Sequence, residues 1–533
     1  MHLSTPTKLP PQGLLTIALL AGMIMGLAPA PGNAWFLAWG AIVPLWVLVV
    51  QISSEVNRTS KGLPKLAFLL GVTWGVGYNG LALSWIRDLH PLTWMGIPWL
   101  ASVAITFTCW LLITLWGGLL VGVWAGGLAW ANQRGLSAVT RIVLGTALWC
   151  GLETVWSWSP LEWTFLSFTQ SPHDRWILHL GQLAGPMLVT GAIVAFNGFL
   201  AEGWLARESY PGRRAKWLWA LGLVWLIGLH GIGWGLVSRP AFGGSVERSL
   251  KAPPEAALRV GIVQGNIPTR IKLFEEGTRL SIDNYTKGYE TLVAQGVQAV
   301  LTPEGTFPWL WLDRPLKNPF YRTLLDRGIL AWVGTVGLEQ GKLTQSLVTI
   351  AGDGEILSRY DKVKLVPLGE YVPFAETIGQ FIGRLSPVEA SLTPGQINQQ
   401  VKTPFGQAIV GICFDSAFSY IFRNQARSGG EFILTASNND PYGAAMMAQH
   451  HAQDVMRAIE TDRWAVRATN TGFSGIVNPH GETEWLSGFR TFETHAHTIA
   501  RRQTQTPYVR WGNWFTPLLS LLAIGLCIRD FRA

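Results

Sequence analysis

One cysteine stands apart from the other three in this sequence. Cys413 follows a short apolar and β-branched stretch, residues 407–412, that has the pattern of a buried strand. A thiol at the end of a strand can face a pocket while the strand behind it stays rigid. Cys109, Cys150 and Cys527 lie inside long apolar runs instead. A strand-end cysteine taken alone is more often a small buried hydrophobic residue, so a catalytic interpretation of Cys413 depends on its partners.

Two further stretches carry reactive side chains where strands are expected to end. Glu304 follows the apolar segment that ends at Leu301, and Lys362 stands in a polar run that ends at Tyr371. A thiol must lose its proton before it can attack a carbonyl carbon. A carboxylate can take that proton, and a lysine can lower the thiol pKa and stabilise an oxyanion. Separately, Glu304 could cap a helix and Lys362 could be a solvated charge, but three such stretches in one domain favour nucleophilic catalysis.

The elements that must position these residues share the chain with a large apolar region. Of 533 residues, 49% are hydrophobic and only 14% are charged, whereas a soluble enzyme has about a quarter charged residues. The net charge of +8 comes without a basic run interleaved with aromatic residues, so we expect no nucleic-acid partner. The four cysteines have no metal-ligand spacing and leave no pair for a disulfide framework, which predicts no metal site.

Apolar runs of about 20 residues, the length that spans a bilayer, fill the first half of the chain. We expect a membrane domain over residues 1–240, with seven transmembrane helices at 13–30, 34–51, 65–86, 99–126, 138–157, 177–203 and 216–236. The first run could also be a cleaved signal peptide, but its direct continuation into the second favours a retained helix. A last transmembrane helix is expected within 511–529.

Lysine and arginine residues are unevenly distributed over the loops between these runs. The loops after the second, fourth and sixth runs hold most of them, namely Arg58, Lys61, Lys65, Arg134, Arg141, Arg207, Arg213, Arg214 and Lys216. The alternate loops hold only Arg87 and Arg175. Because basic loops stay in the cytoplasm, we expect both termini to be cytoplasmic and everything between residue 240 and the last helix to be extracytoplasmic.

From Leu258 the pattern changes to short β-branched runs that alternate with amphipathic, more charged segments. The expected strands are 258–264, 298–302, 329–335, 346–351, 407–413, 431–436, 464–469 and 474–478. The helical pattern is clearest at 274–295 and 444–461. Strands that alternate with helices predict a layered α/β domain, here over residues 257–500.

This α/β region resembles the nitrilase, or carbon–nitrogen hydrolase, superfamily. The resemblance depends on the three stretches above and on the segments 263–268, 437–443, 449–450, 457–463 and 467–472. The order of membrane helices, nitrilase-like domain and final helix resembles the apolipoprotein N-acyltransferase family. The resemblance implies an α-β-β-α sandwich in which Glu304 is the general base, Lys362 stabilises the oxyanion and thiolate, and Cys413 is the nucleophile.

The resemblance also implies further site residues. Glu370, Asp415 and Phe414 would support the catalytic set, and Phe274, Trp309 and Asn438 would bind substrate. The chain departs from the family where Phe414 and Asp415 replace the usual Tyr and Glu, and where residues 272–274 replace a loop that often carries Trp. Trp309 belongs to an aromatic run that could equally be an ordinary buried cluster.

The implied reaction is lipid acyl transfer without a cofactor. Cys413 would take an acyl chain from a phospholipid as a thioester and pass it to the N-terminal diacylglyceryl-cysteine of a lipoprotein, the final step of lipoprotein maturation. The partners would be the phospholipid, the diacylated lipoprotein and the bilayer. The location would be a bacterial inner membrane, with the catalytic domain in the periplasm. The alternatives are a membrane-anchored amidase, a transporter with a regulatory domain and an inactive scaffold.

Overall fold

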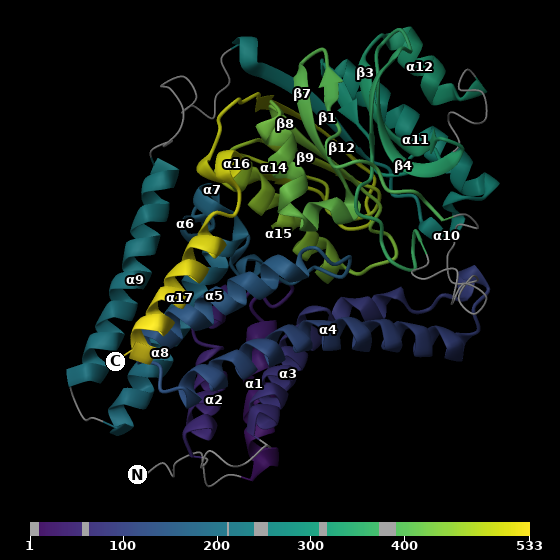
Figure 1. The fold of residues 1–533 in the computed structure, drawn as a ribbon. Helices are drawn as coiled ribbons and strands as arrows, with labels where there is room; N and C mark the ends of the chain where they lie inside the picture. The colour runs from purple at the N-terminus through teal and green to yellow at the C-terminus, as the bar shows by residue number, and fades with distance from the viewer. Residues whose placement is uncertain are drawn as a thin grey trace. The chain divides into compact units, whose positions relative to one another are not determined.

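The computed structural model describes residues 10–55, 63–209, 213–238, 254–308, 317–371 and 391–532 (Figure 1). The chain divides into two compact units. The helical unit comprises Met1–Arg87, Ala104–Ser238 and Asn513–Ala533, and the α/β unit comprises Asp88–Val103 and Arg239–Gly512. We describe each unit by itself.

Long helices make up the helical unit. They are α1 (Pro11–Gly26), α2 (Val43–Glu55), α3 (Leu63–Ala82), α4 (Trp99–Gln133), α5 (Ala138–Trp156), α8 (Pro186–Ser209), α9 (Arg213–Ser238) and α17 (Phe515–Arg532). By length and apolar composition alone, five segments of the described chain could cross a membrane: α4, α5, α9, residues Pro186–Arg207 of α8, and Trp35–Ser54, which contains most of α2. The expected span 177–203 is wrong at its start. The short helices α6 (Arg175–Leu178) and α7 (Gly181–Ala184) precede α8, which begins only at Pro186.

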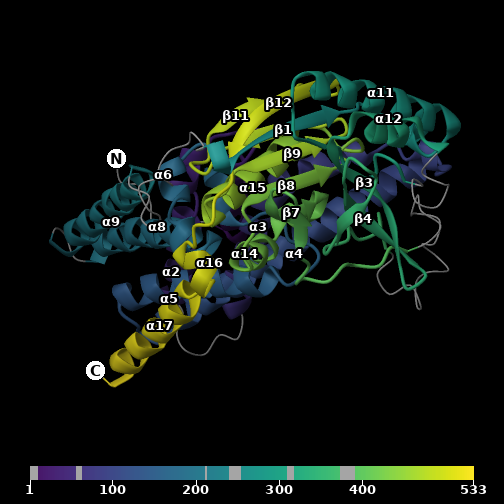
Figure 2. The same ribbon diagram turned by 90° about the horizontal axis from the view of Figure 1, so that it is seen from above.

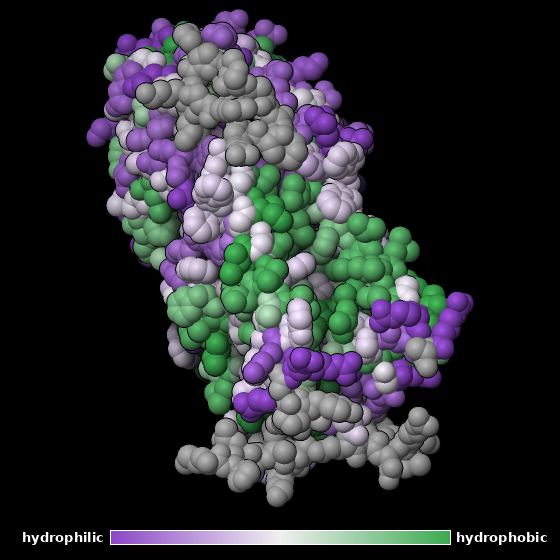
Figure 3. Space-filling view, turned by 90° about the vertical axis from the view of Figure 1, so that its left-hand side faces the viewer, coloured by the Kyte–Doolittle hydropathy of each residue, from purple (hydrophilic) through white to green (hydrophobic). Residues whose placement is uncertain are grey.

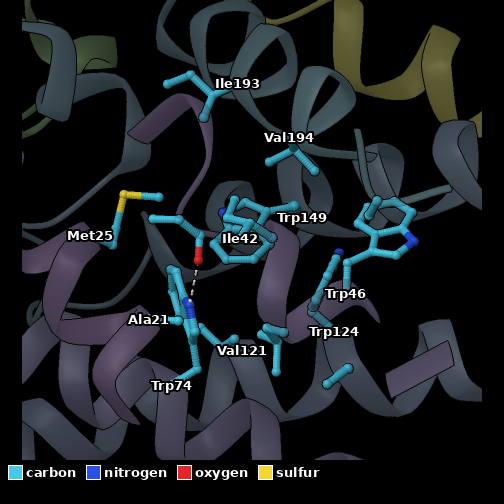
Figure 4. Packing of buried hydrophobic residues seen from close by; sticks show 14 of the residues in the cluster. Ala21, Met25, Ile42, Trp46, Trp74, Val121, Trp124, Trp149, Ile193 and Val194 are labelled. Carbon is cyan, nitrogen blue, oxygen red and sulfur yellow. Dashed lines mark hydrogen bonds between the residues drawn. The ribbon is translucent and has the colours of Figure 1, made fainter. Parts of the chain in front are cut away.

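Tryptophan side chains form the centre of the helical unit (Figure 4). Trp46, Trp74, Trp124 and Trp149 are almost completely buried. Each indole N–H has an acceptor: Trp74 donates to the Ala41 carbonyl at 3.0 Å, Trp124 to Gly145 O, Trp46 to Glu202 and Trp149 to Glu153. An apolar medium offers no water to satisfy these donors, so the bonds fix how the helices pack as well as burying large apolar rings.

The outer face of the helical unit is apolar. Val224 on α9 is 68% exposed and Leu521 on α17 is 67% exposed, and other large apolar side chains of both helices are also exposed. Figure 3 shows hydrophobic surface of this kind, in green, with hydrophilic side chains beyond it. Exposed apolar faces of this extent are expected where a helix contacts lipid.

Two six-stranded sheets form the α/β unit, in the orders β12-β1-β2-β3-β4-β5 and β11-β10-β9-β8-β7-β6. The first sheet contains β1 (Ala257–Gln264), β2 (Ala299–Leu301), β3 (Leu330–Glu339), β4 (Lys342–Ile350), β5 (Ile356–Asp361) and β12 (Glu493–Ala500). The second contains β6 (Val401–Thr403), β7 (Gly406–Ile412), β8 (Phe432–Ser437), β9 (Ala465–Thr469), β10 (Gly475–Val477) and β11 (Thr483–Leu486).

Helices cover the two sheets. α11 (Glu275–Ala294) and α12 (Pro319–Arg327) lie together beside the first sheet, and α14 (Ser419–Arg427) and α15 (Ala444–Thr461) lie beside the second (Figures 1 and 2). Tyr285, Tyr289 and Phe320 from this helical layer pack on Val263 and Val300 of the first sheet. The expected α-β-β-α sandwich is therefore confirmed.

The sequence pattern missed four strands, β5, β6, β11 and β12. In β12, polar and histidine side chains alternate without an apolar face, and most of them are only partly buried. This strand pairs with β1 along its full length, so backbone hydrogen bonds rather than hydrophobic side chains hold it in the sheet. β5 leads directly into Lys362, so β5 is the missed strand that matters most for the site.

Candidate active site

The three sequence-predicted catalytic residues come together at strand ends. Glu304 follows β2 and Lys362 follows β5 in the first sheet, whereas Cys413 follows β7 in the second. The Lys362 Nζ atom lies 2.9 Å from Glu304 Oε1 and 2.6 Å from Glu370 Oε1. Packing the two sheets face to face thus brings a carboxylate–lysine pair to a thiol that is distant in the chain.

Cys413 occupies a strained turn. Its φ of +49° is in the left-handed region that non-glycine residues rarely adopt, and it begins the short helix η9 (Cys413–Ala417). Its Sγ atom lies 3.9 Å from Asn439 Oδ1. Burial raises the pKa of the Cys413 thiol, the charge of Glu304 raises it further, and Lys362 opposes both. The resting thiol is therefore protonated and needs a base at the moment of attack.

Glu304 is held in position by donors on both oxygens. Oε1 accepts from Lys362, and Oε2 accepts from the backbone N–H of Asn438 at 2.8 Å. Burial works against the charge of Lys362, but the carboxylates of Glu304 and Glu370 outweigh it and raise the lysine pKa well above its usual value. Lys362 therefore stays a cation, with Glu304 bonded to its ammonium group.

Glu370 belongs to the loop that follows β5. Its Oε2 accepts from the Val366 N–H at 2.8 Å, while its Oε1 accepts from Lys362. Burial raises the pKa of Glu370, and Lys362 works in the opposite direction. Glu370 thereby connects its loop to the Lys362 ammonium, and its supporting role in catalysis stays a prediction.

Asp415 joins the lysine segment to the cysteine turn. Its Oδ1 accepts from the Lys364 N–H at 2.7 Å, and its Oδ2 accepts from the Ile412 N–H and the Tyr360 hydroxyl, both at 3.0 Å. Burial raises the pKa of Asp415 to about 6, although these donors lower it. One carboxylate therefore joins the Tyr360 side chain and the backbone after Lys362 to the backbone beside Cys413.

The predicted substrate-binding residues have different environments. Phe274 is 64% exposed at the start of α11, and its contact with substrate stays a prediction. Trp309 lies outside the described residues. The Asn438 side chain bonds Thr269 and Asn470, so its amide is engaged within the protein. The ring of Phe414 lies 5.1 Å from that of Phe418, edge to face.

The sequence pattern did not single out Lys272 as part of the site. This lysine is buried, and its Nζ donates to the backbone carbonyl of Glu304 at 3.0 Å. Burial lowers the pKa of Lys272 to about 8, against the charges of Glu304 and Asp440. It supplies a second positive charge beside the Glu304 segment. The sequence signal was present but ambiguous, because a lysine in a loop is usually solvated.

Asn439 and His450 were also missed. Both are buried and both bond Cys413: Asn439 Oδ1 lies 3.9 Å from the thiol, and His450 Nε2 lies 2.8 Å from the Cys413 carbonyl oxygen. Asn439 lies in the loop between β8 and α15, and His450 lies on α15. Both belong to segments that carry the family resemblance, 437–443 and 449–450, but no role was assigned to either residue there. Within the described ranges, no group of three His, Cys, Asp or Glu side chains could hold a metal ion.

Family models match both halves of the chain. The apolipoprotein N-acyltransferase N-terminal domain matches residues 21–199, and the carbon–nitrogen hydrolase domain matches residues 285–504. An apolipoprotein N-acyltransferase of Nostoc sp. (strain PCC 7120) is 52% identical over 93% of this chain and 95% of its own length. One from Synechocystis sp. (strain PCC 6803) is 45% identical over 94% of this chain and 97% of its own.

Among solved structures, the chain is similar to an amidase from Nesterenkonia sp. AN1. The two share 18% identity over 49% of this chain and 96% of the amidase, with a TM-score of 0.37.

Proposed function

This chain belongs to the apolipoprotein N-acyltransferase family, and from that premise we propose that it carries an acyl group from a phospholipid to a lipoprotein through a thioester on Cys413. It is an acyltransferase with a carbon–nitrogen hydrolase domain and a membrane-type helical unit. The observation that most supports the finer mechanism is the buried pair of Lys362 and Glu304, whose charges act on the Cys413 thiol.

In the first half-reaction, Cys413 Sγ attacks the ester carbonyl carbon of the phospholipid. Glu304 takes the thiol proton as the C–S bond forms, and the Lys362 ammonium stabilises the oxyanion. The C–O bond then breaks, and Glu304 returns the proton to the leaving alkoxide. The products are a lysophospholipid and the thioester. The raised pKa of the buried thiol is the reason that proton transfer must accompany the attack.

In the second half-reaction, the acceptor is the α-amine of a diacylglyceryl-cysteine at the N-terminus of a lipoprotein. The neutral amine attacks the thioester carbonyl, and Glu304 accepts the amine proton. Glu304 then passes this proton to the Cys413 sulfur as the C–S bond breaks, which regenerates the thiol. An amide is formed, which is more stable than the thioester. Cys413 is 6% exposed, and this burial limits the access of water that would otherwise hydrolyse the intermediate.

The test is the mass of the purified protein after mixing with phospholipid vesicles. The wild-type chain should gain one acyl mass, which a diacylated lipopeptide removes quickly and water removes slowly. Cys413→Ser should gain none, because a hydroxyl is far less ionised and less nucleophilic than a thiol. Cys150→Ala is the matched control, since Cys150 is also buried but lies in α5 of the helical unit. Rapid loss of the acyl mass in water alone would instead favour an amidase.

We further propose that the α/β unit is extracytoplasmic and that both termini are cytoplasmic, in the inner membrane of a bacterium. The asymmetry of lysine and arginine between alternate loops supports this orientation. A reporter enzyme that is active only outside the cytoplasm should be active when fused after residue 260 and inactive when fused after residue 533. A reporter that is active only in the cytoplasm should show the reverse. The opposite pattern would overturn the orientation without affecting the chemistry.

A further inference from the structure

A closed ring of hydrogen bonds surrounds the nucleophile. The Cys413 thiol donates to Asn439 Oδ1 at 3.9 Å, Asn439 Nδ2 lies 3.3 Å from His450 Nδ1, and His450 Nε2 lies 2.8 Å from the Cys413 carbonyl oxygen. Asn439 is 1% exposed and His450 is fully buried. The ring therefore starts and ends on one residue, joining its side chain to its own backbone.

The hydrogen positions in this ring follow from its chemistry. A carbonyl oxygen only accepts, so His450 Nε2 carries the hydrogen that bonds Cys413. Burial lowers the pKa of His450 to about 3, and the charge of Arg467 adds to the effect, so the imidazole is neutral. Nδ1 is then an acceptor, which directs the Asn439 amide nitrogen toward it. The Asn439 oxygen is consequently left facing the thiol.

The backbone at Cys413 needs such support. Its positive φ is a conformation that a side chain with a Cβ disfavours, and it persists only when the surroundings impose it. On the N-terminal side, the Ile412 N–H is held by Asp415. On the C-terminal side, the Cys413 carbonyl is held by His450. These two bonds hold the peptide unit before Ile412 and the peptide unit after Cys413, and thereby restrain the direction of the Cys413 Cα–Cβ bond.

We propose that His450 is a positioning residue that holds the nucleophile turn through its neutral Nε2–H and, through Asn439, fixes the position of the thiol. The proposal rests on the proposed function, because it assigns the means by which Cys413 is aimed. His450 transfers no proton in this role. Its neighbour His451, which bonds Thr483 instead, has no part in it.

Two substitutions separate this role from a general effect on packing. In His450→Gln, the amide nitrogen can occupy the position of Nε2 and still donate to the Cys413 carbonyl. In His450→Asn, the same amide is one methylene shorter and cannot reach. His451→Gln is the matched control, because His451 is the adjacent buried histidine of α15. Thermal unfolding of each purified full-length variant measures any effect on the fold.

Two readouts are taken. The first is the single-turnover rate of acyl-enzyme formation with phospholipid vesicles. We expect His450→Asn to lose about 10²-fold in rate at unchanged KM, and His450→Gln to stay within about 3-fold of wild type, because a small misplacement of a reacting atom costs rate rather than binding. The pH–rate profile of His450→Gln should match that of wild type between pH 5 and 9, since no titrating group has been lost.

The second readout is the rate of Cys413 alkylation by iodoacetamide, which needs no acyl donor. Cys413 in His450→Asn should be alkylated about 10-fold more slowly than in wild type, because a thiol displaced from the Lys362 charge ionises less readily, whereas His450→Gln and His451→Gln should match wild type. The proposal would be overturned if His450→Gln and His450→Asn had the same acylation rate and the same alkylation rate as each other. It would also be overturned if the pH–rate profile of His450→Gln lost its acidic or its basic decline. A wild-type chain that is alkylated but never acylated would overturn the proposed function alone.

Discussion

The two units bury carboxylates in opposite ways. In the α/β unit, Glu304 lies against the Lys362 ammonium, and its charge acts on a reactive thiol. In the helical unit, Glu153 on α5 accepts from the Trp149 indole at 3.0 Å, from the Leu166 N–H at 3.0 Å and from the Thr190 hydroxyl at 2.8 Å. The first carboxylate has a cation and a nucleophile beside it, and the second has only neutral donors.

The difference teaches that burial alone does not identify a catalytic acid or base. Glu153 lies on α5 and bonds both Leu166, which precedes α6, and Thr190 on α8. It therefore acts as a structural bridge between these three segments. Glu202 on α8 is also a bridge, because it bonds Trp46 and forms an ion pair with Arg141. A charge within an apolar helical unit is costly unless it is bonded in this way. Four substitutions, from the largest expected effect on acyl transfer to the smallest, test the distinction.

Lys362→Met should abolish acyl-enzyme formation, with a loss of about 10³-fold or more. It removes the cation that stabilises the oxyanion and leaves Glu304 and Glu370 facing each other without a charge between them. The measurement is single-turnover acylation followed by mass spectrometry. Lys364→Ala is the control, because the Lys364 ammonium lies 4.5 Å from the Phe418 ring and bonds neither carboxylate. Equal losses of acylation rate in Lys362→Met and Lys364→Ala would contradict a specific role for Lys362.

Asp415→Asn should lower the acylation rate by about 10-fold to 10²-fold, because an amide nitrogen cannot accept from the Ile412 N–H. The pKa of Asp415 is raised to about 6 by burial, so protonation below that pH removes acceptors in the same way. We therefore expect the wild-type rate to fall as the pH drops through about 6. A pH–rate profile of Asp415→Asn that kept the same acidic limb would show that another group titrates there.

Lys272→Met should reduce the rate by about 10-fold, the usual loss for a charge-assisted hydrogen bond to a catalytic segment. The pKa of Lys272 is lowered to about 8 by burial, so its positive charge is present below that pH and is lost above it. The wild-type rate should decline above pH 8, and this decline should be absent from the variant. Lys287→Met is the control, since Lys287 lies against the Phe492 ring away from the catalytic group.

Glu202→Gln should leave the transfer rate per folded molecule unchanged within about 2-fold, but should destabilise the helical unit by about 3 kcal/mol, as expected when one partner of a buried ion pair is removed. The midpoint of thermal unfolding in detergent measures this loss. Glu290→Gln is the matched control, because its ion pair with Arg327 is exposed on both sides and should contribute little. A large loss of activity with unchanged stability would place Glu202 in the chemistry and break the comparison.

Much of the site could be predicted because it depends on local features. Lys362 follows β5, whose mixed polar sequence hid the strand, so this lysine was recognised from the polar run that ends at Tyr371. Glu304 and Cys413 each follow an apolar strand, and a reactive side chain at such a position is visible in the sequence. The same holds for α15, whose bounds of Ala444–Thr461 equal the predicted range 444–461. Amphipathic periodicity determines a helix of this kind with little help from the rest of the chain.

What the sequence determined by itself was the set of reactive residue types, the division into apolar and α/β regions, and the elements with a clear hydrophobic pattern. Only the tertiary structure decided which polar groups meet. Lys272, Asn439 and His450 are ordinary in sequence, and their roles come from contacts between segments separated by 26 or more residues, such as Cys413 with Asn439 and Lys272 with Glu304. The physical reason is that hydrophobic periodicity is a local property, whereas the partner of a buried polar group is chosen by the packing of two sheets.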